Sequence, residues 1–268
     1  EQKLDLYRLQ FARAGCTLFR MRETQAIIER VRRISPDLQQ LDLSTDASLS
    51  QLQPGHSLFA HLLENTQYLP YLREQWFPIA IDGARLVVEL APQQRYHPGQ
   101  VVSLLTPVGR PIPLRNGVQN VLMIAHDTLP TPLVLLAQQL VSSQVAVTLV
   151  LGGTALRYPL ELLPPEIEVV HGDTGWTWPD QVQTLGWADQ VIALAPPYAQ
   201  MDIYRALYET IAQLRPGDIP ENYALGLFHQ PLACGTGACQ ACQVPCRGGD
   251  LLACTDGPAI DLKRVAFR

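Results

Sequence analysis

The chain has 268 residues, of which 47% are hydrophobic and 17% charged, and its formal net charge is −5. It contains no run of Lys or Arg of the kind that grips a phosphate backbone, which argues against nucleic-acid binding. No uninterrupted apolar stretch reaches the roughly eighteen residues of a membrane span, and the N-terminus lacks the apolar core of a signal peptide. We therefore expect a cytoplasmic protein without a membrane span, long enough for two domains.

The first half of the chain has the pattern of an antiparallel β domain. It begins with an N-terminal extension at residues 1–20. The segment 25–43 is rich in β-branched residues and is divided by Ser35-Pro36-Asp37, which favours two strands and a turn, although its first part also fits a helix. Asp82-Gly83 lies between two apolar runs and is a strong hairpin signal. We expect an antiparallel barrel or sandwich over residues 21–116.

The character of the sequence changes near Gly117. Apolar, strand-like runs now alternate with helical stretches, which is the pattern of a parallel sheet with right-handed crossovers. The expected strands are 120–125, 145–151, 167–170 and 190–194, and the expected helices are 132–140 and 199–214. We therefore expect an α/β domain over residues 117–216, followed by a cysteine module over residues 217–268.

Four cysteines in this module carry the strongest functional signal. Cys234, Cys239 and Cys242 have the spacing C-x4-C-x2-C, and Cys254 follows at a distance. This arrangement holds a plant-type [2Fe–2S] cluster. Small residues between the first three cysteines let the backbone fold tightly around the inorganic sulfides and direct its N–H groups at the negative cluster. Because such a cluster carries one electron at a time, the segment implies electron transfer.

Other interpretations of the cysteines remain open. Cys239 and Cys242 alone would fit a zinc ribbon, although a ribbon usually brings a second C-x2-C pair. Disulfides suit small secreted domains, and this chain has neither property. Cys246 could replace Cys254 as a ligand, or it could lie unligated between the two halves of the site. Cys16 is expected to be a small core residue.

In the order of its parts and in its cysteine segment, the chain resembles the electron-transfer subunit of the heterodimeric, NAD-dependent dihydroorotate dehydrogenases, within the ferredoxin–NADP reductase superfamily. The similarity is most specific in residues 233–242 and 254–258. It implies a flavin-binding-type barrel, an NAD-binding-type α/β domain and a cluster module placed next to a catalytic partner. It further implies a hetero-oligomer with a flavoprotein catalytic subunit, acting in pyrimidine biosynthesis.

The flavin segments of that family are only partly present. The family's flavin strand reads Arg-Pro-x-Ser-Ile, whereas residues 77–81 read Phe-Pro-Ile-Ala-Ile. Transferred position by position, the resemblance implies that FAD would be contacted by Arg73, Pro78, Ile79, Ala80 and Gly109. Arg73, however, lies four residues too early to replace the missing arginine, and the family's serine is an alanine. The sequence therefore leaves FAD binding open.

The nicotinamide loop departs further from the family. Where the family reads Gly-Gly-Gly-x-Gly-x-Ala-Pro, residues 125–132 read Ala-His-Asp-Thr-Leu-Pro-Thr-Pro. The glycines would let a pyrophosphate approach the backbone, whereas Asp127 would repel it. We therefore expect that the chain neither binds NAD nor oxidises NADH or NADPH at a useful rate, and we assign no catalytic residue.

Two functions follow from these observations. In the first, the chain is an iron–sulfur subunit that relays electrons between a flavin and a partner oxidoreductase. In the second, it is a degenerate reductase kept as a structural or regulatory subunit, with the cluster as a scaffold. Reversible reduction of the cluster would distinguish the first function from the second.

Overall fold

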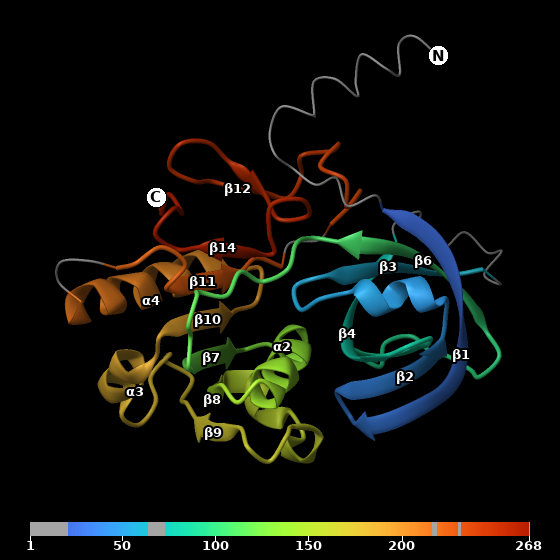
Figure 1. The fold of residues 1–268 in the computed structure, drawn as a ribbon, viewed down its shortest axis with the longest axis horizontal. Coiled ribbons are helices and arrows are strands. Elements are labelled where there is room, and N and C mark those ends of the chain that lie inside the picture. Colours follow the sequence, from blue (N-terminus) through green and yellow to red (C-terminus); the bar gives the residue numbers. More distant parts are fainter. Residues whose placement is uncertain (1–20, 64–72, 216–218, 230–231, 268) are drawn as a thin grey trace, which may run out of the picture.

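The structure is a computed structural model that describes residues 21–63, 73–215, 219–229 and 232–267. Its first part is a closed, six-stranded antiparallel barrel, which confirms the predicted fold class (Figure 1). The strand order around the barrel is β1-β2-β5-β4-β3-β6. The strands are β1 (Arg22–Ser35), β2 (Leu38–Ser44), β3 (Ser57–Leu62), β4 (Glu74–Asp82), β5 (Arg85–Leu90) and β6 (Val101–Val108), with a short 3-10 helix, η2 (Ala47–Gln51), between β2 and β3.

The first strand closes the barrel. The helix considered for its first part does not form, and β1 pairs with β2 on one side and β6 on the other. Register shifts between Ile28 and Arg30, and again near Ser35, mark bulges. Such bulges bend a strand and increase its twist, which lets β1 pair with both of its neighbours. The interior is filled by large apolar side chains, among them Leu41, Leu58, Trp76 and Leu104.

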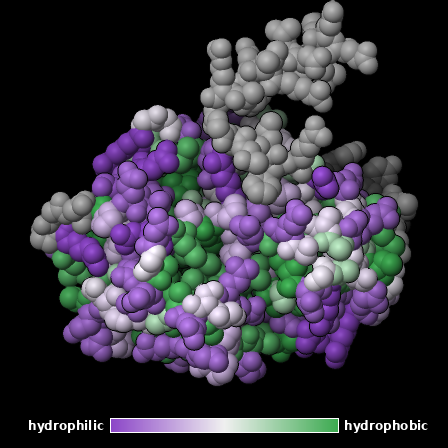
Figure 2. Space-filling view, viewed as in Figure 1, coloured by the Kyte–Doolittle hydropathy of each residue, from purple (hydrophilic) through white to green (hydrophobic). Residues whose placement is uncertain are grey.

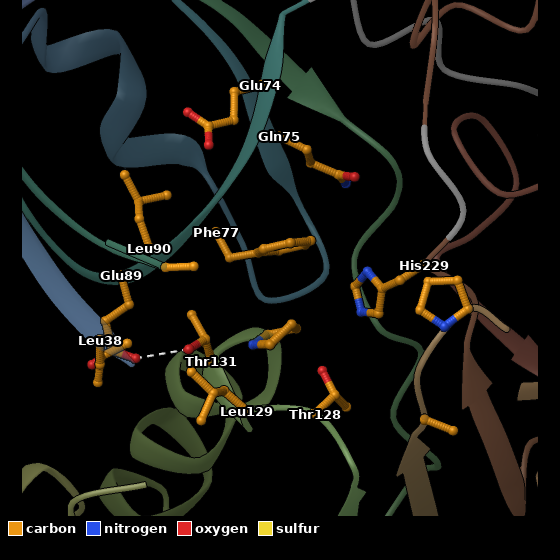
Figure 3. Close-up of a pocket in the computed structure, with 14 residues that line it drawn as sticks. Leu38, Glu74, Gln75, Phe77, Glu89, Leu90, Thr128, Leu129, Thr131 and His229 are labelled. Carbon is orange, nitrogen blue, oxygen red and sulfur yellow. Dashed lines mark hydrogen bonds between the residues drawn. The ribbon is translucent and has the colours of Figure 1, made fainter. Parts of the chain in front are cut away.

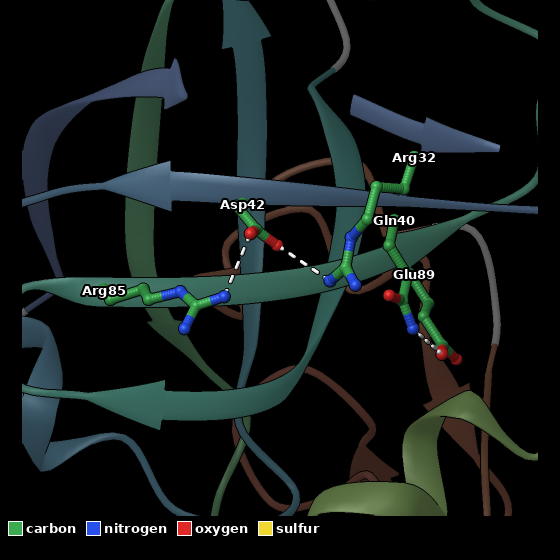
Figure 4. Close-up of polar contacts among 5 residues, drawn as sticks. All are labelled: Arg32, Gln40, Asp42, Arg85 and Glu89. Atoms are coloured by element: carbon green, nitrogen blue, oxygen red, sulfur yellow. Dashed lines mark hydrogen bonds and ion pairs between the residues drawn. The ribbon is translucent and has the colours of Figure 1, made fainter. Parts of the chain in front are cut away.

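Two ion pairs that share Asp42 join three neighbouring barrel strands (Figure 4). Asp42 on β2 accepts from Arg32 on β1 at 3.1 Å and from Arg85 on β5 at 3.0 Å. The arginine side chains are 35% and 59% exposed, so each pair contributes on the order of 0–1 kcal/mol. These contacts help to fix the strand order, whereas the apolar interior supplies most of the stability.

The second part of the chain is the predicted α/β domain. Its six-stranded sheet has the order β14-β11-β10-β7-β8-β9, parallel throughout except for β14. The strands are β7 (Asn120–His126), β8 (Ala146–Gly152), β9 (Glu168–His171), β10 (Gln190–Leu194), β11 (Ala224–Leu227) and β14 (Ala259–Asp261). The helices are α2 (Thr131–Ser142), α3 (Gln181–Trp187) and α4 (Gln200–Leu214), with 3-10 turns η3 (Gly153–Arg157) and η4 (Leu160–Leu162).

Successive side chains of β7, a central strand, point to opposite faces of the sheet. Val121 and Met123 of β7 pack into the core that contains α2, whereas Leu122 and Ile124 pack into the core that contains α4. Helix α2 also contacts β4, so it lies between the sheet and the barrel (Figure 1). The barrel and the sheet therefore share a buried boundary.

One buried carboxylate crosses this boundary. Glu89 on β5 is 3% exposed and accepts from Gln40 of the barrel at 2.9 Å (Figure 4). From the α/β side, Thr131 donates to it at 2.9 Å and Tyr158 at 3.1 Å. Burial raises the pKa of this carboxyl, although the hydrogen bonds from Gln40, Thr131 and Tyr158 oppose that rise. Glu89 thus fixes the relative position of the two parts.

The C-terminal segment is built into the sheet rather than appended to it. Two of the sheet strands, β11 and β14, come from the segment that we assigned to the cysteine module, and β14 pairs antiparallel with β11. Between them lies a small hairpin of β12 (Gln243–Val244) and β13 (Leu251–Leu252). The cysteine loops are therefore held between the edge of a buried sheet and the end of the barrel.

On the face seen in Figure 2, hydrophobic residues reach the surface in several separate places between hydrophilic ones. The most exposed large hydrophobic residues of the described chain are Tyr198, at 83%, and Val182, at 58%. Within the described residues, no helix is both long enough and apolar enough to cross a membrane.

Candidate iron–sulfur centre and adjoining cleft

Two glycines shape the loop that carries the first three cysteines. Gly235 and Gly237 have φ values of +68° and +79°, in the left-handed region that favours glycine. A Cβ atom on Gly235 would lie 2.8 Å from the ring of Phe59, and one on Gly237 would lie 3.2 Å from Leu252. The loop therefore turns tightly, as the small residues between the cysteines predicted, and it packs against the end of the barrel and the β12–β13 hairpin.

Backbone N–H groups in this loop point at the sulfur of Cys234. The N–H of Thr236 lies 3.4 Å from that sulfur and the N–H of Cys239 lies 3.5 Å from it. Partial burial would raise the pKa of the Cys234 thiol, but the hydrogen bonds from Cys239 and Thr236 outweigh it and lower the pKa to about 6. The loop thus favours a thiolate at this position, and the thiolate is the form that binds metal.

The other two sulfurs form a close pair. The Sγ atoms of Cys242 and Cys254 lie 3.3 Å apart, and both residues are buried. Burial, followed by the adjacent Cys242 sulfur, raises the pKa of the Cys254 thiol to about 12. The N–H of Ala253 donates to the carbonyl of Cys242 at 3.0 Å, which holds the two loops together. A positive group beside Cys254 would favour its thiolate, which burial disfavours.

The donor set fits an iron–sulfur group. The thiols come in two pairs, because Cys239 contacts Cys234 through both its N–H and its thiol, while Cys242 contacts Cys254. In a [2Fe–2S] cluster bound by four thiolates, each iron takes one such pair. Within the described residues, no three His, Cys, Asp or Glu side chains surround a single point at which one ion could sit.

The remaining two cysteines stand elsewhere. Cys246 is buried and forms an isolated bridge with Val265. Burial raises the pKa of its thiol, and its charged neighbours are Arg264 and Asp250 rather than another cysteine. Cys16 lies outside the described residues. The structure thus brings together the four cysteines proposed as ligands and leaves Cys246 in a separate contact.

The five residues proposed for FAD lie in three different environments. Arg73 donates to Ser103 at 2.8 Å and to Glu23 at 2.6 Å, on the outside of β6 and β1. Pro78 and Ile79 are buried in β4, and Ala80 lines a second cavity, beside α2. Gly109 donates its N–H to the carbonyl of Cys254 at 3.1 Å. These residues are not gathered around one site.

Gly109 instead belongs to the junction between the barrel and the cluster loops. Its φ is +90°, and a Cβ atom there would lie 3.1 Å from the proline ring of Pro258 and from the carbonyl of Gly55. The next residue, Arg110, donates to the carbonyl of Thr255 at 2.6 Å and pairs with Asp256 at 3.5 Å. Sequence reasoning missed this junction, because nothing local in the sequence indicates which loop the end of β6 will meet.

A cleft lies between the barrel and the sheet (Figure 3). Its volume is about 420 Å³, and its walls come from β4 and β5, the start of α2, the loop after β10 and His229. Phe77 and His229 meet edge to face there, with ring centroids 4.9 Å apart. Phe77 occupies the position where the family strand has its arginine. Sequence reasoning identified that exchange but not the contact with His229.

Parallel sheets of this type bind dinucleotides at the carboxyl ends of their strands, which here are the ends of β7 and β8. In this chain, side chains of the protein itself occupy that position. Asp127 adopts a φ of 50°, and its carboxylate accepts the N–H of Thr154 at 3.1 Å. The same carboxylate presses against Gly153, where a Cβ atom could not fit. The ring of His126 stacks on Trp176 at 5.0 Å. A carboxylate therefore stands at the turn that a phosphate would approach.

Comparison with known proteins agrees with the fold and with the cysteine loops. Residues 229–266 match the family model described as the iron–sulfur cluster binding domain of dihydroorotate dehydrogenase B. Curated proteins give no match to the sequence as a whole.

Solved structures share the fold over most of the chain. A chain of the NADH-dependent reduced ferredoxin–NADP oxidoreductase superposes with a TM-score of 0.69 at 19% identity, covering 90% of each chain. The ferredoxin reductase of carbazole 1,9a-dioxygenase gives a TM-score of 0.55 at 16% identity, covering 78% of this chain and 70% of that one. The Amycolatopsis cytochrome P450 reductase gives 0.58 at 16% identity, covering 80% and 72%.

The chain thus combines a ferredoxin-reductase fold with a match, over residues 229–266, to an iron–sulfur cluster binding domain. The predicted resemblance to the electron-transfer subunit of dihydroorotate dehydrogenase B is confirmed by the cluster domain and the shared fold.

Proposed function

We propose that Cys234, Cys239, Cys242 and Cys254 hold one [2Fe–2S] cluster, through which the chain relays electrons between a flavin and a partner oxidoreductase. The partner is a flavoprotein catalytic subunit similar to a dihydroorotate dehydrogenase, and the complex acts in pyrimidine biosynthesis in the cytoplasm. The observation that carries the proposal is the close pair formed by Cys242 and Cys254 across the hairpin, 3.3 Å apart, next to the Cys234 loop.

When bound, such a cluster accepts and returns a single electron. The chain's own residues prepare the site for it. The N–H groups of Thr236 and Cys239 stabilise a thiolate at Cys234, and the glycine turns bring the loop close to the barrel. Buried residues such as Val244 and Ala253 exclude water behind the Cys242–Cys254 pair. Hydrogen bonds and burial of this kind set the reduction potential of a cluster.

The cluster loops also join the barrel to the sheet. Gly109 contacts the carbonyl of Cys254, and Arg110 contacts Thr255 and Asp256. On the other side, the N–H of Phe228 donates to the carbonyl of Pro258 at 2.9 Å. Both domains thus hold the loop that carries Cys254, and a cluster bound there would keep one position relative to the barrel and the sheet.

In this proposal the chain does not bind NAD. The Asp127 carboxylate occupies the turn between β8 and η3, and an anionic pyrophosphate would have to displace it. Rapid mixing of the cluster-loaded chain with NADH, without oxygen, should therefore leave the visible spectrum unchanged over seconds, while dithionite bleaches it. Bleaching by NADH at a comparable rate would contradict this part of the proposal.

A second candidate function is a catalytically silent structural or regulatory subunit that retains the cluster. The carboxylate of Asp127 favours it, because it stands where the pyrophosphate of a nicotinamide donor would approach and would repel that pyrophosphate. Spectroelectrochemical titration of the native protein separates the two functions. Reversible one-electron reduction within the potential range of biological donors supports a relay. A cluster that is not reduced, or that breaks down on reduction, supports the structural role.

A further inference from the structure

Two of the four cysteines proposed as ligands are already in contact through the protein itself. The Sγ atoms of Cys242 and Cys254 lie 3.3 Å apart, and the two residues are only 2% and 3% exposed. A disulfide holds its sulfurs about 2.05 Å apart, so these two sulfurs need to approach by only roughly 1.3 Å to form one. The pair is therefore placed for a second chemistry besides metal binding.

The β12–β13 hairpin holds the pair together. Cys242 directly precedes β12 and Cys254 lies two residues after β13, and the two strands are antiparallel. The N–H of Ala253 donates to the carbonyl of Cys242 at 3.0 Å, and the side chain of Val244 in β12 is buried. From the barrel, the N–H of Gly109 donates to the carbonyl of Cys254 at 3.1 Å. All these contacts are between protein groups, so they hold the two thiols together without the help of a metal.

The other described cysteines lack this arrangement. Cys239 is exposed on the loop that precedes the hairpin, where it contacts Cys234. Cys246 is buried, and none of the described groups that shift the pKa of its thiol is a cysteine. Two reacting groups that are held in contact react as if they were present at a very high concentration. The close pair should therefore be the first to combine on oxidation.

We propose that Cys242 and Cys254 form a disulfide when the cluster-free chain meets a peroxide, and that this disulfide prevents the cluster from being rebuilt. In the first step, the Cys242 sulfur attacks one peroxide oxygen, the O–O bond breaks, and a sulfenic acid forms as hydroxide leaves. The hydroxide takes up the proton that the Cys242 thiol has lost. In the second step, the Cys254 sulfur attacks the sulfenic sulfur, and its proton leaves with the hydroxyl group as water. Two electrons thus pass from the two sulfurs to the peroxide.

The disulfide acts as a redox switch on the proposed electron relay, because it joins two of the four ligands. Exchange with a dithiol such as dithiothreitol restores both thiols, and the dithiol leaves as its own disulfide. This inference rests on the proposed cluster site, but the disulfide forms on the cluster-free chain. A chain that binds no cluster can still form the disulfide, and a chain that binds one can fail to form it. The two proposals can therefore fail separately.

Peptide mapping tests the bond itself. The full chain is freed of metal with a chelator, reduced, desalted and treated with hydrogen peroxide, and its remaining thiols are alkylated under denaturing conditions before digestion with trypsin. Cleavage after Arg247 separates Cys254 from the cysteines that precede it. Mass spectrometry should find the two fragments joined, and sequencing of the joined fragments should place the bond at Cys242. A disulfide confined to the earlier fragment, or a Cys254 that is alkylated as a free thiol, would overturn the proposal.

Two variants and a rebuilding assay complete the test. Cys242→Ser should abolish the joined fragments, whereas Cys246→Ser, the matched control at a neighbouring buried thiol, should keep them, with folding checked by circular dichroism. When iron and sulfide are supplied, the peroxide-treated parent should regain at least about tenfold less cluster absorbance than the reduced parent, because two ligands are blocked. Dithiothreitol should restore the absorbance. If the oxidised and reduced chains rebuild the cluster equally well, the disulfide does not control the site and the proposed switch is wrong.

Discussion

Contacts between thiols, of Cys239 with Cys234 and of Cys242 with Cys254, distinguish these four cysteines from the buried Cys246. Backbone hydrogen bonds lower the pKa of the Cys234 thiol, whereas burial and the adjacent Cys242 sulfur raise the pKa of the Cys254 thiol. The Cys246 thiol also receives a backbone hydrogen bond, from Leu251, but its charged neighbours are Arg264 and Asp250 rather than another cysteine, and its backbone forms an isolated bridge with Val265. The proposed ligands therefore differ from Cys246 in the contacts of their own side chains.

Replacing each cysteine by serine tests this distinction. Cys234→Ser, Cys239→Ser, Cys242→Ser and Cys254→Ser should each lower the iron content and visible absorbance of the chain by about tenfold or more, because an alcohol is a poor ligand for iron. Cys246→Ser, the matched control, should keep the full cluster. Loss of the cluster in Cys246→Ser together with its retention in Cys254→Ser would refute the assignment.

The pKa of Glu89 predicts how the stability of the folded chain depends on pH. Burial raises the pKa of this carboxyl above its ordinary value of 4.5 in the folded chain. The folded state therefore holds the proton more tightly than the unfolded state. The resulting stability is fully present below about pH 4.5 and is lost as the pH rises through the folded pKa.

Glu89→Gln should remove this pH dependence, since an amide does not titrate. The difference in free energy of unfolding between the variant and the parent should change with pH by up to about 1.4 kcal/mol for each unit by which the pKa is raised. Urea titrations from pH 5 to 8 measure it. A difference that stays constant over this range would show that the pKa of Glu89 is not raised.

At the scale of elements, local signals identified most of the fold. The Asp82-Gly83 turn marks the β4–β5 hairpin, and the apolar run at 120–125 marks β7, because both depend on neighbours in sequence. Neighbours in sequence did not determine whether the segment of β1 forms a helix or a strand. Its pairing with both β2 and β6 decided it. The partners of Arg73 are not local either, since they lie on β1 and β6, and its contact with a flavin stays a prediction.

Two glycines give a matched test of the junction between barrel and cluster loops. Gly109 and Gly99 have nearly the same φ, +90° and +89°, but only Gly109 is enclosed by neighbouring backbone and by Pro258. Gly99→Ala should cost about 1 kcal/mol of backbone strain. Gly109→Ala adds a steric conflict, so it should cost roughly 1–3 kcal/mol more and release the cluster faster.

Thermal unfolding and the rate of cluster loss to a chelator measure both effects. If the two alanine variants lose equal stability, the packing of Gly109 against the Cys254 loop contributes nothing, and the junction has no structural role.

At the scale of the whole molecule, the barrel, the sheet and the cysteine loops contact one another. Residues 229–266 match an iron–sulfur cluster binding domain, whereas among the described residues the Asp127 carboxylate stands at the turn that the pyrophosphate of a dinucleotide would approach. We therefore expect the chain to act in a hetero-complex with a flavoprotein catalytic subunit, with the cluster loops near an interface of standard size, about 1,600 Å². Native mass spectrometry of the complex from its own cells should show both chains, and a stable cluster-loaded monomer would contradict it.

Electron paramagnetic resonance of the native protein, reduced by dithionite without oxygen, tests the central claim most directly. Four thiolates around a [2Fe–2S] cluster predict a signal that integrates to roughly one unpaired electron per chain and disappears on reoxidation. A protein that contains zinc in place of iron, or that gives no signal after reduction, would contradict the account.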